Sequence, residues 1–470
     1  MYAIQKNGIN NYLWNVINDL NKDLTANVKT KHGPTRNFRI KDSIRQGGVV
    51  SVLLYALLMD EIAKEIQAKN TGSKIPGTTK NLGCLLWMDD VVLIHNTADG
   101  LQDLLNTTDK IAKKYHIEFG KEKSKVMTLG QKDRPNNFKI GEMKMEQTPT
   151  YKYLGETINN KNNLDDHIKE IKGKAEAAFQ TILIIAGDKD LRGIQMKTIW
   201  RLLDACIKPI ITYACETWYP RKGDISKLNK ILDNIIKRIL KTPVTTPRET
   251  LYIETKILYV EHTMNRNRIL MLHRLENNSN DLVKNFLKTT HPTSWSESTR
   301  KIMKEYTDND VTQTSTHTAK TMVNKAAKET CIQHMHSSGK QKPKVEFLLQ
   351  NSNPYDKDTP KYLTELCRNH TSIIFKARTR MIKVKRNFKT KYKNNLMCRG
   401  CGKEEETQLH VLQECKVIHT DETTKIYQQD LFDNSKETTK LQEMANKLIK
   451  IEEQINKDPQ QDTEVKCPPS

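Results

Sequence analysis

Two neighbouring aspartates, Asp89 and Asp90, are the residues of this sequence whose type and position first suggest chemistry. Short apolar runs on both sides, residues 85–88 and 91–94, predict a β-hairpin with the two aspartates at its tip. Carboxylates held this close repel each other, and a divalent cation relieves the repulsion. Nucleotidyl transfer requires such a site, because two metal ions clamp the attacking and leaving oxygens. For the dipeptide alone an ordinary polar turn is the stronger interpretation, since aspartate is common in turns.

Near the C-terminus, three cysteines and one histidine have the spacing of a metal site. The pattern is Cys398-x2-Cys401-x8-His410-x4-Cys415, and three thiolates with one imidazole suit tetrahedral Zn²⁺. Four protein ligands fill the coordination sphere, so the pattern predicts a structural zinc rather than a catalytic one. The alternatives are free thiols beside a surface histidine, or His419 in place of His410, although the spacing favours His410.

A basic segment directly precedes this cluster. Between residues 376 and 393 the sequence has no acidic residue, and Phe375, Phe388 and Tyr392 stand among the basic ones. Cations attract phosphates and aromatic rings stack on unpaired bases, so we predict contact with nucleic acid. A nuclear-localisation signal would use the same residue types. The candidate nucleic-acid-binding residues are Lys376, Arg378, Arg380, Lys383, Lys385, Arg386 and Lys389.

The whole chain is strongly basic. Its 470 residues include 77 Lys and Arg against 56 Asp and Glu, a formal net charge of +21. Such a surplus attracts polyanions, so nucleic acid is the leading partner. The charge alone is about equally consistent with a lysine-rich protein whose charges serve only solvation. With 36% hydrophobic and 28% charged residues, the chain can form packed cores separated by solvated helices and loops, in two or three domains.

The sequence predicts neither membrane insertion nor secretion. The longest apolar run, residues 47–59, is too short to cross a bilayer and continues into Asp60 and Glu61. The N-terminus has neither the apolar core nor the cleavage pattern of a signal peptide. Nine thinly spread cysteines do not resemble a disulfide framework. We therefore expect an intracellular protein in a reducing compartment, either in the nucleus or in a cytoplasmic ribonucleoprotein.

Hydrophobic periodicity predicts an α+β fold. The first third combines an amphipathic helix, a strand pair, an apolar helix and the aspartate hairpin, followed by a helix that Thr97 caps. The expected ranges of the first four elements are 11–24, 28–40, 47–66 and 81–96. Later helices are expected at 168–186, 198–219, 225–240 and 263–275, and Pro209 should kink or divide the second of these.

Several short motifs follow one another in the order and spacing of a known family. Arg45-Gln46-Gly47 and Ser51 precede the two aspartates, Lys123-Ser124-Lys125 follows them, and Tyr151-Lys152-Tyr153-Leu154-Gly155 comes next. Together with the aspartate hairpin, these motifs resemble the palm of a LINE-type (non-LTR) retrotransposon reverse transcriptase. Each motif alone is weak, but four in the right order are specific. The resemblance extends through a thumb-like run at 207–218 as far as Cys415, and so covers nearly the whole chain.

The resemblance implies an RNA-directed DNA polymerase that uses an RNA template, a DNA primer, deoxynucleotides and Mg²⁺ or Mn²⁺. It implies that Asp89 and Asp90 hold the catalytic metal. It also implies that Lys123 faces the nucleotide phosphates, although a solvated lysine is the competing interpretation. The residues implied for nucleotide and template are Arg45, Gln46, Gly47 and Ser51, and those implied for the primer grip are Tyr151, Tyr153, Leu154 and Gly155.

The implied organisation has five parts. Residues 1–160 would form a partial palm and residues 161–290 a helical thumb and connector. Residues 291–356 are expected to be a linker with marginal helices, because apolar residues are scattered there. Residues 357–420 would hold the basic stretch and the zinc module. Residues 421–470 would form a helix and a disordered tail.

The sequence also departs from the family. Trp87 and Met88 stand where the family usually has Tyr-Ala or a similar pair, and Gly48 and Val49 stand where polar, small or proline residues are typical. The family's first catalytic aspartate lies upstream of the segment that matches residues 7–9, and two-metal catalysis without it should be badly impaired. We therefore expect a truncated copy or a fragment that is weak or inactive alone. The alternatives are a non-catalytic RNA- or DNA-binding protein derived from a retrotransposon, and an inert relic.

Overall fold

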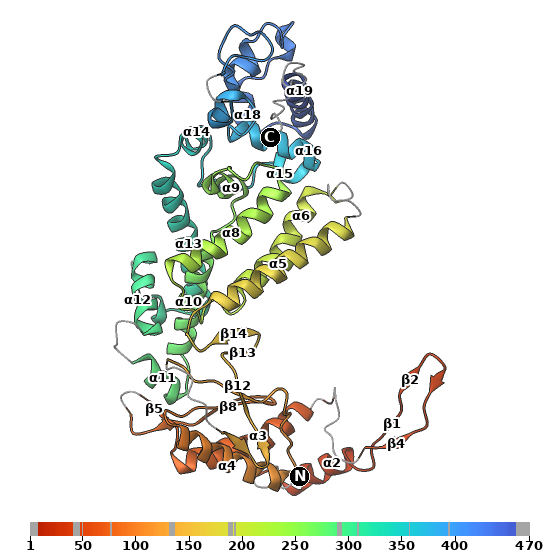
Figure 1. The fold of residues 1–470 in the computed structure, drawn as a ribbon, viewed down its shortest axis with the longest axis vertical. Helices are drawn as coiled ribbons and strands as arrows, with labels where there is room; N and C mark the ends of the chain where they lie inside the picture. Colours follow the sequence, from red (N-terminus) through yellow and green to blue (C-terminus); the bar gives the residue numbers. More distant parts are fainter. Residues whose placement is uncertain are drawn as a thin grey trace, which may run out of the picture. The chain divides into compact units, whose positions relative to one another are not determined.

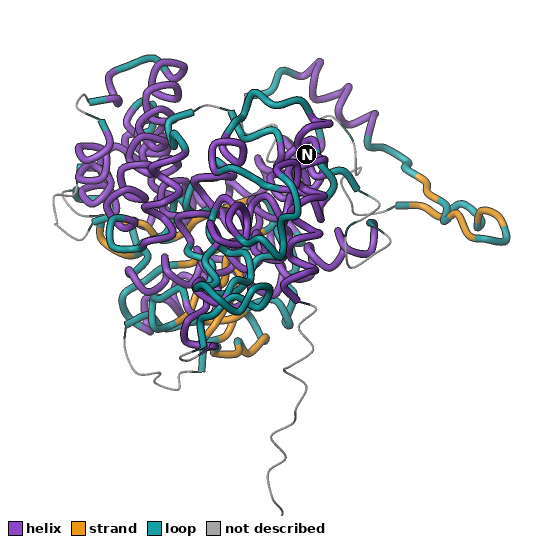
Figure 2. The backbone as a smooth tube through the Cα atoms, turned by 90° about the horizontal axis from the view of Figure 1, so that it is seen from above, coloured by secondary structure: helices purple, strands orange, loops and turns teal. Residues whose placement is uncertain are grey.

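The computed structural model describes residues 8–40, 48, 50–75, 78–130, 137–186, 191, 194–288, 294–307, 310–356, 358–392 and 395–456. The chain divides into two compact units. The strand-rich unit comprises residues 1–153, 158–162 and 280–289, and the helical unit comprises residues 154–157, 163–279 and 290–470. Short strands in the first and long helices in the second give an α+β protein, which confirms the predicted fold class (Figures 1 and 2).

The centre of the strand-rich unit is a hairpin covered by two helices. The hairpin consists of β7 (Cys84–Trp87) and β8 (Asp90–Leu93), and it contacts α3 (Ser51–Lys69) and α4 (Ala98–Tyr115). Thr97 caps α4 by accepting a hydrogen bond from the Gly100 N–H, as predicted. The shared core contains Met59, Ile62, Ala63, Ile66, Cys84, Leu104 and Ile111.

Gly83 allows the hairpin to lie close to α3. A Cβ atom at this position would lie 2.5 Å from the Thr71 carbonyl oxygen and 2.6 Å from Cγ2 of Ile66. Distances this short are repulsive, so only glycine fits without displacing backbone. The close approach brings the apolar side of the hairpin into the core that Ile66 helps to form.

The remaining strands of this unit are short and pair only in twos. The ladders are β1 (Thr25–Ala26) with β4 (Phe38–Arg39), β2 (Lys29–Thr30) with β3 (Gly33–Pro34), β5–β6, β9–β12 and β10–β11, and only the β9–β12 pair among these is parallel. A second small core, formed by Leu105, Val126, Phe138, Ile140 and Met145, lies beneath α4 and β10. The bounds are β5 Ser73–Lys74, β6 Asn81–Leu82, β9 Lys125–Val126, β10 Lys139–Ile140, β11 Met143–Lys144, β12 Glu146–Gln147 and β13 Thr150–Tyr153.

The predicted N-terminal helix is present but has no buried residue. It is α2 (Asn11–Leu20), which ends four residues earlier than expected and is capped by the Asn10 side chain at the Leu13 N–H. Its apolar face is exposed, with Leu13 at 49% and Leu20 at 56% exposure. The periodicity therefore predicted the helix correctly, but the described residues do not bury its apolar face.

The helical unit begins with a helical hairpin. Its first arm is α5 (Asp165–Ile185). The second arm continues from α6 (Met196–Leu202) through a π-helical turn, Leu203–Ile207, into α7 (Lys208–Thr212). Pro209 lies in the first turn of α7, where its missing N–H costs least, and the π-helical turn before it interrupts the regular α-helix. The helix expected at 198–219 ends at Thr212 instead.

The next helix, α8 (Lys222–Ile239), buries the apolar stripe that the sequence predicted. Leu228, Ile231, Leu232, Ile235, Ile236 and Ile239 all lie in the main core. The other helices of this part of the chain are α9 (Arg248–Thr255), α10 (Val260–Glu276) and, in the strand-rich unit, α11 (Asp281–Leu287).

Residues 294–351 differ from the expected linker with marginal helices. They form α12 (Trp295–Tyr306), α13 (Thr316–Gly339) and α14 (Pro343–Asn351), joined by a short 3-10 turn at Val311–Gln313. Small apolar residues of α13 pack against α10, and Val323, Ala327 and Cys331 are fully buried. The prediction was wrong because alanines and a cysteine provide the buried face, and they contribute little to an apolar pattern.

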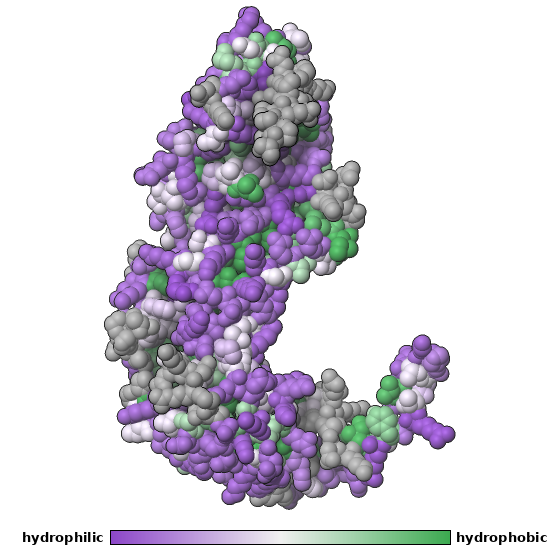
Figure 3. All heavy atoms as spheres, viewed as in Figure 1, coloured by the Kyte–Doolittle hydropathy of each residue, from purple (hydrophilic) through white to green (hydrophobic). Residues whose placement is uncertain are grey.

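The chain ends in a helical region around the cysteine cluster. Its helices are α15 (Tyr362–Glu365), α16 (Arg368–Arg378), α17 (Lys389–Tyr392), α18 (Gln428–Phe432) and α19 (Thr438–Asn456). α16 packs against α19. The expected disordered tail after residue 456 lies outside the described residues. The visible surface is mostly hydrophilic (Figure 3), and no helix among the described ranges is long and apolar enough to cross a membrane.

The burial of α13 predicts a cost for shortening one of its core side chains. Met335 is 3% exposed, so Met335→Ala should lower the free energy of unfolding by about 2–5 kcal/mol, measured by urea denaturation. Lys328→Ala, at an exposed position of the same helix, is the matched control and should change it by less than about 0.5 kcal/mol. Equal, small effects of both substitutions would show that this segment is a loosely structured linker after all.

Candidate active site and metal cluster

The two aspartates lie at the turn of the β7–β8 hairpin, as predicted. Trp87 pairs with Asp90, so Met88 and Asp89 form a two-residue turn. Met88 has a φ of 54°, the left-handed conformation that such tight hairpin turns require. Both carboxylates are exposed, so their mutual repulsion is screened by water and both remain open to a cation.

Two tyrosines face these carboxylates from different elements. Burial, and then the negative charge of Asp89, raises the pKa of Tyr55 on α3. Burial and the charge of Asp90 likewise raise the pKa of Tyr153 on β13. The sequence motifs included Tyr153 but missed Tyr55, although Tyr55 lies one helical turn after Ser51 and therefore on the same face of α3.

The described part of the strand-rich unit offers no further carboxylate or histidine that gathers with Asp89 and Asp90 into a three-ligand site. Glu61, a buried carboxylate of α3, accepts a hydrogen bond from the Tyr115 hydroxyl at 3.0 Å instead. Ser51 lies buried in the first turn of α3. Arg45, Gln46 and Gly47 lie outside the described residues, so their predicted role stays a prediction.

Lys123 and the predicted primer grip are neighbours. Lys123 is exposed in a turn, and its carbonyl oxygen accepts a hydrogen bond from the Tyr151 hydroxyl at 2.9 Å. The bond fixes the backbone of the lysine and leaves its ammonium group in solvent. The structure thus brings two sequence-predicted residues together through a main-chain atom.

Leu154 and Gly155 form a two-residue turn in which both φ values are positive, 46° and 86°. Within the helical unit, the Tyr213 hydroxyl donates a hydrogen bond to the Leu154 carbonyl oxygen at 2.9 Å. A Cβ atom at Gly155 would lie 3.0 Å from the Tyr213 ring. Glycine is therefore required here both by the backbone conformation and by the ring beside it.

Cys398, Cys401, His410 and Cys415 come together as predicted, with their ligand atoms all within 4.8 Å of one another. The sulfurs of Cys398 and Cys415 are 3.9 Å apart, and the Cys401 sulfur lies 3.4 Å from Nε2 of His410. Zn–S bonds of about 2.3 Å at tetrahedral angles place two sulfurs about 3.8 Å apart. The donor set and its spacing therefore fit a tetrahedral metal such as Zn²⁺.

The surroundings of the cluster favour the thiolate of Cys401 and place a carboxylate beside the imidazole, whereas burial raises the pKa of Cys398 to about 12. Burial opposes ionisation of Cys401, but the N–H groups of Lys403 and Glu404 and the His410 ring lower its pKa to about 6. A Glu404 carboxylate oxygen lies 3.0 Å from Nδ1 of His410. A carboxylate on the second ring nitrogen holds Nε2 toward a metal. The sequence motif did not reveal Glu404.

Glu406 joins the basic stretch to the cluster. Its fully buried carboxylate accepts hydrogen bonds from the Lys385 N–H at 2.9 Å and from the Arg399 guanidinium at 2.7 Å. The Arg399 guanidinium also donates to the Lys383 carbonyl oxygen. The stretch after α16 is therefore tied to the cysteine loop, and the two form one folded region.

Of the seven basic residues proposed to contact nucleic acid, Arg378 and Lys385 are buried and Lys376 is half-buried. Arg378 is 2% exposed, forms a bidentate ion pair with Glu254 at 2.8 and 3.0 Å, and donates to the Leu431 carbonyl oxygen. Lys385 is 5% exposed, and the Lys376 side chain is largely buried beside Glu452. The burial of Arg378 and Lys385 contradicts the prediction of nucleic-acid contact for these two residues, because charged groups enclosed by protein cannot reach a phosphate. For Lys376 the contact stays a prediction.

The other four basic residues are exposed. Lys383 and Lys389 have solvated side chains, and Arg380 stacks its guanidinium over the Phe347 ring at 3.8 Å. Arg386 forms an exposed ion pair with Glu405. A surface cation of this kind can exchange its partner for a phosphate at little cost. The nucleic-acid prediction therefore stays open for Arg380, Lys383, Arg386 and Lys389.

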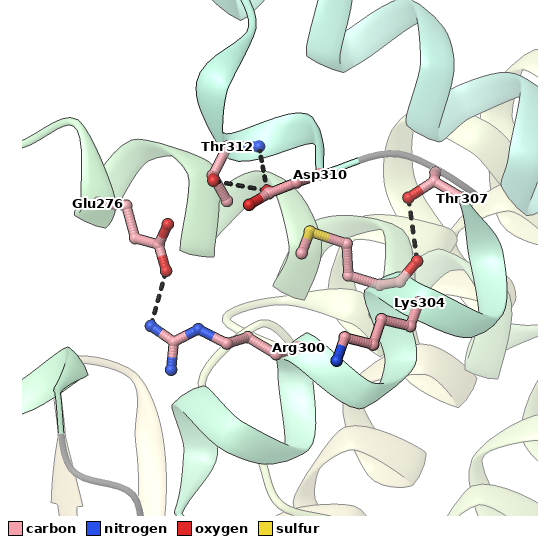
Figure 4. Close-up of a pocket in the computed structure, with 7 residues that line it drawn as sticks. Glu276, Arg300, Lys304, Thr307, Asp310 and Thr312 are labelled. Atoms are coloured by element: carbon pink, nitrogen blue, oxygen red, sulfur yellow. Dashed lines mark hydrogen bonds and ion pairs between the residues drawn. The ribbon is translucent and has the colours of Figure 1, made fainter.

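A cavity of about 240 Å³ lies in the helical unit, well apart in sequence from these sites. Figure 4 shows that the Arg300 guanidinium points across it to Glu276, at 2.7 Å, and that Asp310 bonds to Thr312. Its charged groups are thus mostly paired with each other. Among the described residues, Lys304 is the single lining cation without a partner. One unpaired lysine does not make a catalytic site.

Comparisons with known proteins bear on the first third of the chain most directly. Residues 3–158 match the family model for reverse transcriptase (RNA-dependent DNA polymerase). The chain is 21% identical over 258 residues to a probable RNA-directed DNA polymerase from transposon X-element of Drosophila melanogaster, which covers 54% of this chain and 27% of that protein.

Two further relatives are transposon-derived. One is a putative uncharacterized transposon-derived protein of Caenorhabditis elegans, 26% identical over 176 residues, or 36% of this chain and 61% of the relative. The other is a retrovirus-related Pol polyprotein from type-1 retrotransposable element R2 of Nasonia vitripennis, 25% identical over 234 residues, or 47% of this chain and 21% of the relative. The chain spans less than two thirds of the length of each of these relatives.

The buried Arg378–Glu254 pair predicts a structural role that a nucleic-acid contact would not have. Arg378→Ala leaves the Glu254 carboxylate buried without its cation and should lower the free energy of unfolding by about 3–5 kcal/mol, measured by urea denaturation. Lys383→Ala, at an exposed position five residues later, should change it by less than about 0.5 kcal/mol.

A double variant separates the ion pair from packing. Arg378→Met combined with Glu254→Leu removes both charges and should recover most of the lost stability. A wild-type unfolding free energy for Arg378→Ala, together with weaker nucleic-acid binding, would contradict the structural role.

Proposed function

Because residues 3–158 form a reverse transcriptase domain homologous to those of non-LTR retrotransposon polymerases, we propose that this chain is part of an RNA-directed DNA polymerase of that type. It would copy an RNA template from a DNA primer, using deoxynucleotides and Mg²⁺ or Mn²⁺. The observation that carries the proposal is the pair of exposed carboxylates at the β7–β8 turn, inside the matched domain. We propose the nucleus or a cytoplasmic ribonucleoprotein as its location, because a protein that copies RNA would meet its template there.

Asp89 and Asp90 would hold the divalent metal, which supplies Lewis-acid activation of the primer hydroxyl and the phosphate. Tyr55 and Tyr153 lie near enough to these carboxylates for the charges of Asp89 and Asp90 to raise their pKa values, after burial. The Lys123 ammonium would protonate the departing pyrophosphate, and the Tyr151 hydroxyl holds the Lys123 backbone in place.

The remaining proposed roles follow the order of the motifs. Arg45, Gln46, Gly47 and Ser51 would line the nucleotide and template, where a glycine lets the backbone approach a base pair closely. The primer grip would consist of Tyr151, Tyr153, Leu154 and Gly155, whose tight turn presents main-chain atoms to the primer backbone.

We further propose that the chain by itself polymerises weakly. Two-metal catalysis needs several oxygen ligands for each ion, and the described residues bring only two carboxylates to the turn. A third carboxylate supplied to this site would complete it.

A primer-extension assay on an RNA template with Mg²⁺ or Mn²⁺ tests the polymerase. Asp89→Asn and Asp90→Asn should each lower extension by about 10²- to 10³-fold, because the metal contributes several kcal/mol to the transition state. Asp99→Asn, an exposed aspartate in the first turn of α4, is the matched control and should leave extension unchanged. Extension that survives both variants would contradict the proposed metal site.

The second candidate function is non-catalytic binding of RNA or DNA. The observation that favours it is the set of exposed cations, Arg380, Lys383, Arg386 and Lys389, in the region that Glu406 ties to the cysteine cluster. Measuring template–primer binding across a salt series in the same preparation separates the candidates. Binding without any extension by the wild-type chain would favour this second function over the polymerase.

We propose that the cysteine cluster holds a structural Zn²⁺. Glu404→Gln should lower zinc affinity about 10- to 100-fold, because the neutral amide orients the His410 ring less strongly than a carboxylate does. Competition with a chromophoric chelator measures this affinity. Glu443→Gln, an exposed residue of α19, is the control and should have wild-type affinity. If neither the wild type nor the control binds zinc stoichiometrically, the zinc assignment is contradicted.

A further inference from the structure

We propose that residues 25–39 form a basic arm that binds the backbone of double-stranded nucleic acid, an inference that rests on the polymerase function proposed above. The arm is the two-stranded ribbon made by β1 (Thr25–Ala26), β2 (Lys29–Thr30), β3 (Gly33–Pro34) and β4 (Phe38–Arg39). None of the motifs found in the sequence includes it.

The arm is regular but has no core of its own. Thr25 pairs with Arg39 at its base and Thr30 with Gly33 near its tip, which leaves Lys31 and His32 as the tip loop. Every residue from 27 to 39 is exposed. In both backbone views the ribbon stands clear of the helices of its own unit (Figures 1 and 2). A lone two-stranded ribbon is marginally stable in water, so a surface that covers it would stabilise it.

The register contains a bulge that twists the arm. Ala26 pairs with Phe38, and the next ladder pairs Lys29 with Pro34, so the second strand has one extra residue between them. The Val28 carbonyl oxygen accepts a hydrogen bond from the Thr35 N–H at 2.9 Å, directly beyond the bulge. Bulges increase the right-handed twist of a ribbon, and a twisted ribbon can follow a helical groove.

The charge of the arm points to a polyanion. Residues 24–40 contain Lys29, Lys31, Arg36 and Arg39 and no acidic residue. Arg39 is paired with Asp23 at the base of the arm. The side chains of Lys29, Lys31 and Arg36 have no ion-pair or hydrogen-bond partner among the residues that the structure describes. Three solvated cations on one projecting ribbon match the phosphates of nucleic acid in sign better than they match a mixed protein surface.

The shape of the arm favours a duplex over a single strand. A two-stranded ribbon fits a nucleic-acid groove about 12 Å wide, with phosphates along both edges. The Asn27 amide donates to the Asn37 side chain at 3.0 Å, which occupies part of the hydrogen-bonding capacity of both side chains. Val28 and Phe38 are 54% and 50% exposed and would lie against the sugar edges. The arm would contact mainly the backbone of the duplex, through its three cations.

The test compares two triple variants of the full chain. The arm variant combines Lys29→Gln, Lys31→Gln and Arg36→Gln, and the matched control combines Lys320→Gln, Lys328→Gln and Lys340→Gln at exposed positions in and after α13. Both remove three positive charges. Fluorescence anisotropy measures binding of a short DNA duplex, of its separate strands and of an RNA–DNA template–primer, between about 50 and 200 mM salt.

The arm variant should reduce the slope of log K against log salt for the duplex by about 2.7, at about 0.9 for each lost phosphate contact. The control should keep the wild-type slope. Because the three side chains are exposed and unpartnered, circular dichroism and thermal unfolding should match the wild type.

The outcomes separate this inference from the polymerase proposal. Wild-type binding to the duplex with an unchanged slope in the arm variant overturns the arm inference and leaves the polymerase intact. The arm inference is also overturned if the arm variant lowers the salt slope for the single strands and leaves the slope for the duplex unchanged. A double variant, Val28→Ser with Phe38→Ser, tests whether the arm binds a second copy of the chain instead. That alternative holds if the wild type sediments as a dimer, the double variant sediments as a monomer and the arm variant keeps the wild-type salt slope. Failure of the wild type to bind any template–primer refutes the polymerase proposal itself.

Discussion

The repulsion between Asp89 and Asp90 is the constraint on which the proposed chemistry depends. Two adjacent carboxylates stay together at the hairpin turn because apolar residues of both strands anchor the turn in a core with α3 and α4. The two-residue turn fixes the backbone at both aspartates, so their side chains stay close to each other. Burial of the anchor therefore maintains an electrostatically unfavourable pair that a divalent cation would stabilise.

In the helical unit, by contrast, two opposite charges are buried together. Arg378 and Glu254 are enclosed together with Tyr362, whose ring lies beneath the guanidinium. Burial, and then the Glu254 charge, raises the pKa of Tyr362 well above its usual value, so the tyrosine stays neutral and donates to the carboxylate. A buried ion pair that keeps all its hydrogen bonds specifies how α9 and α16 meet, because either charge alone would be costly.

Much of the fold and part of the candidate site could be predicted from the sequence. Strict apolar periodicity identified α8, an N-cap residue identified α4, and ligand spacing identified the cysteine cluster. The helices at 294–351 were missed because small residues form their buried face. Their start was nevertheless visible, since Ser294 and Glu297 have the capping-box spacing and the Ser294 hydroxyl accepts from the Glu297 N–H. Burial of Arg378 could not be predicted, because its partner Glu254 lies 124 residues away.

The burial of Arg378 shows that the net charge of a chain says little about its single basic residues. A surplus of +21 predicts attraction to a polyanion but does not say which cations reach it. In the segment after α16, two basic residues that the sequence placed on the surface are instead enclosed by protein, at Arg378 and Lys385. In the arm, by contrast, three basic side chains have no partner among the described residues. A carboxylate makes the difference at Arg378, which Glu254 pairs with inside the protein, whereas residues 24–40 contain no acid. Contact with nucleic acid is therefore better inferred from cations that lack a partner than from a count of cations.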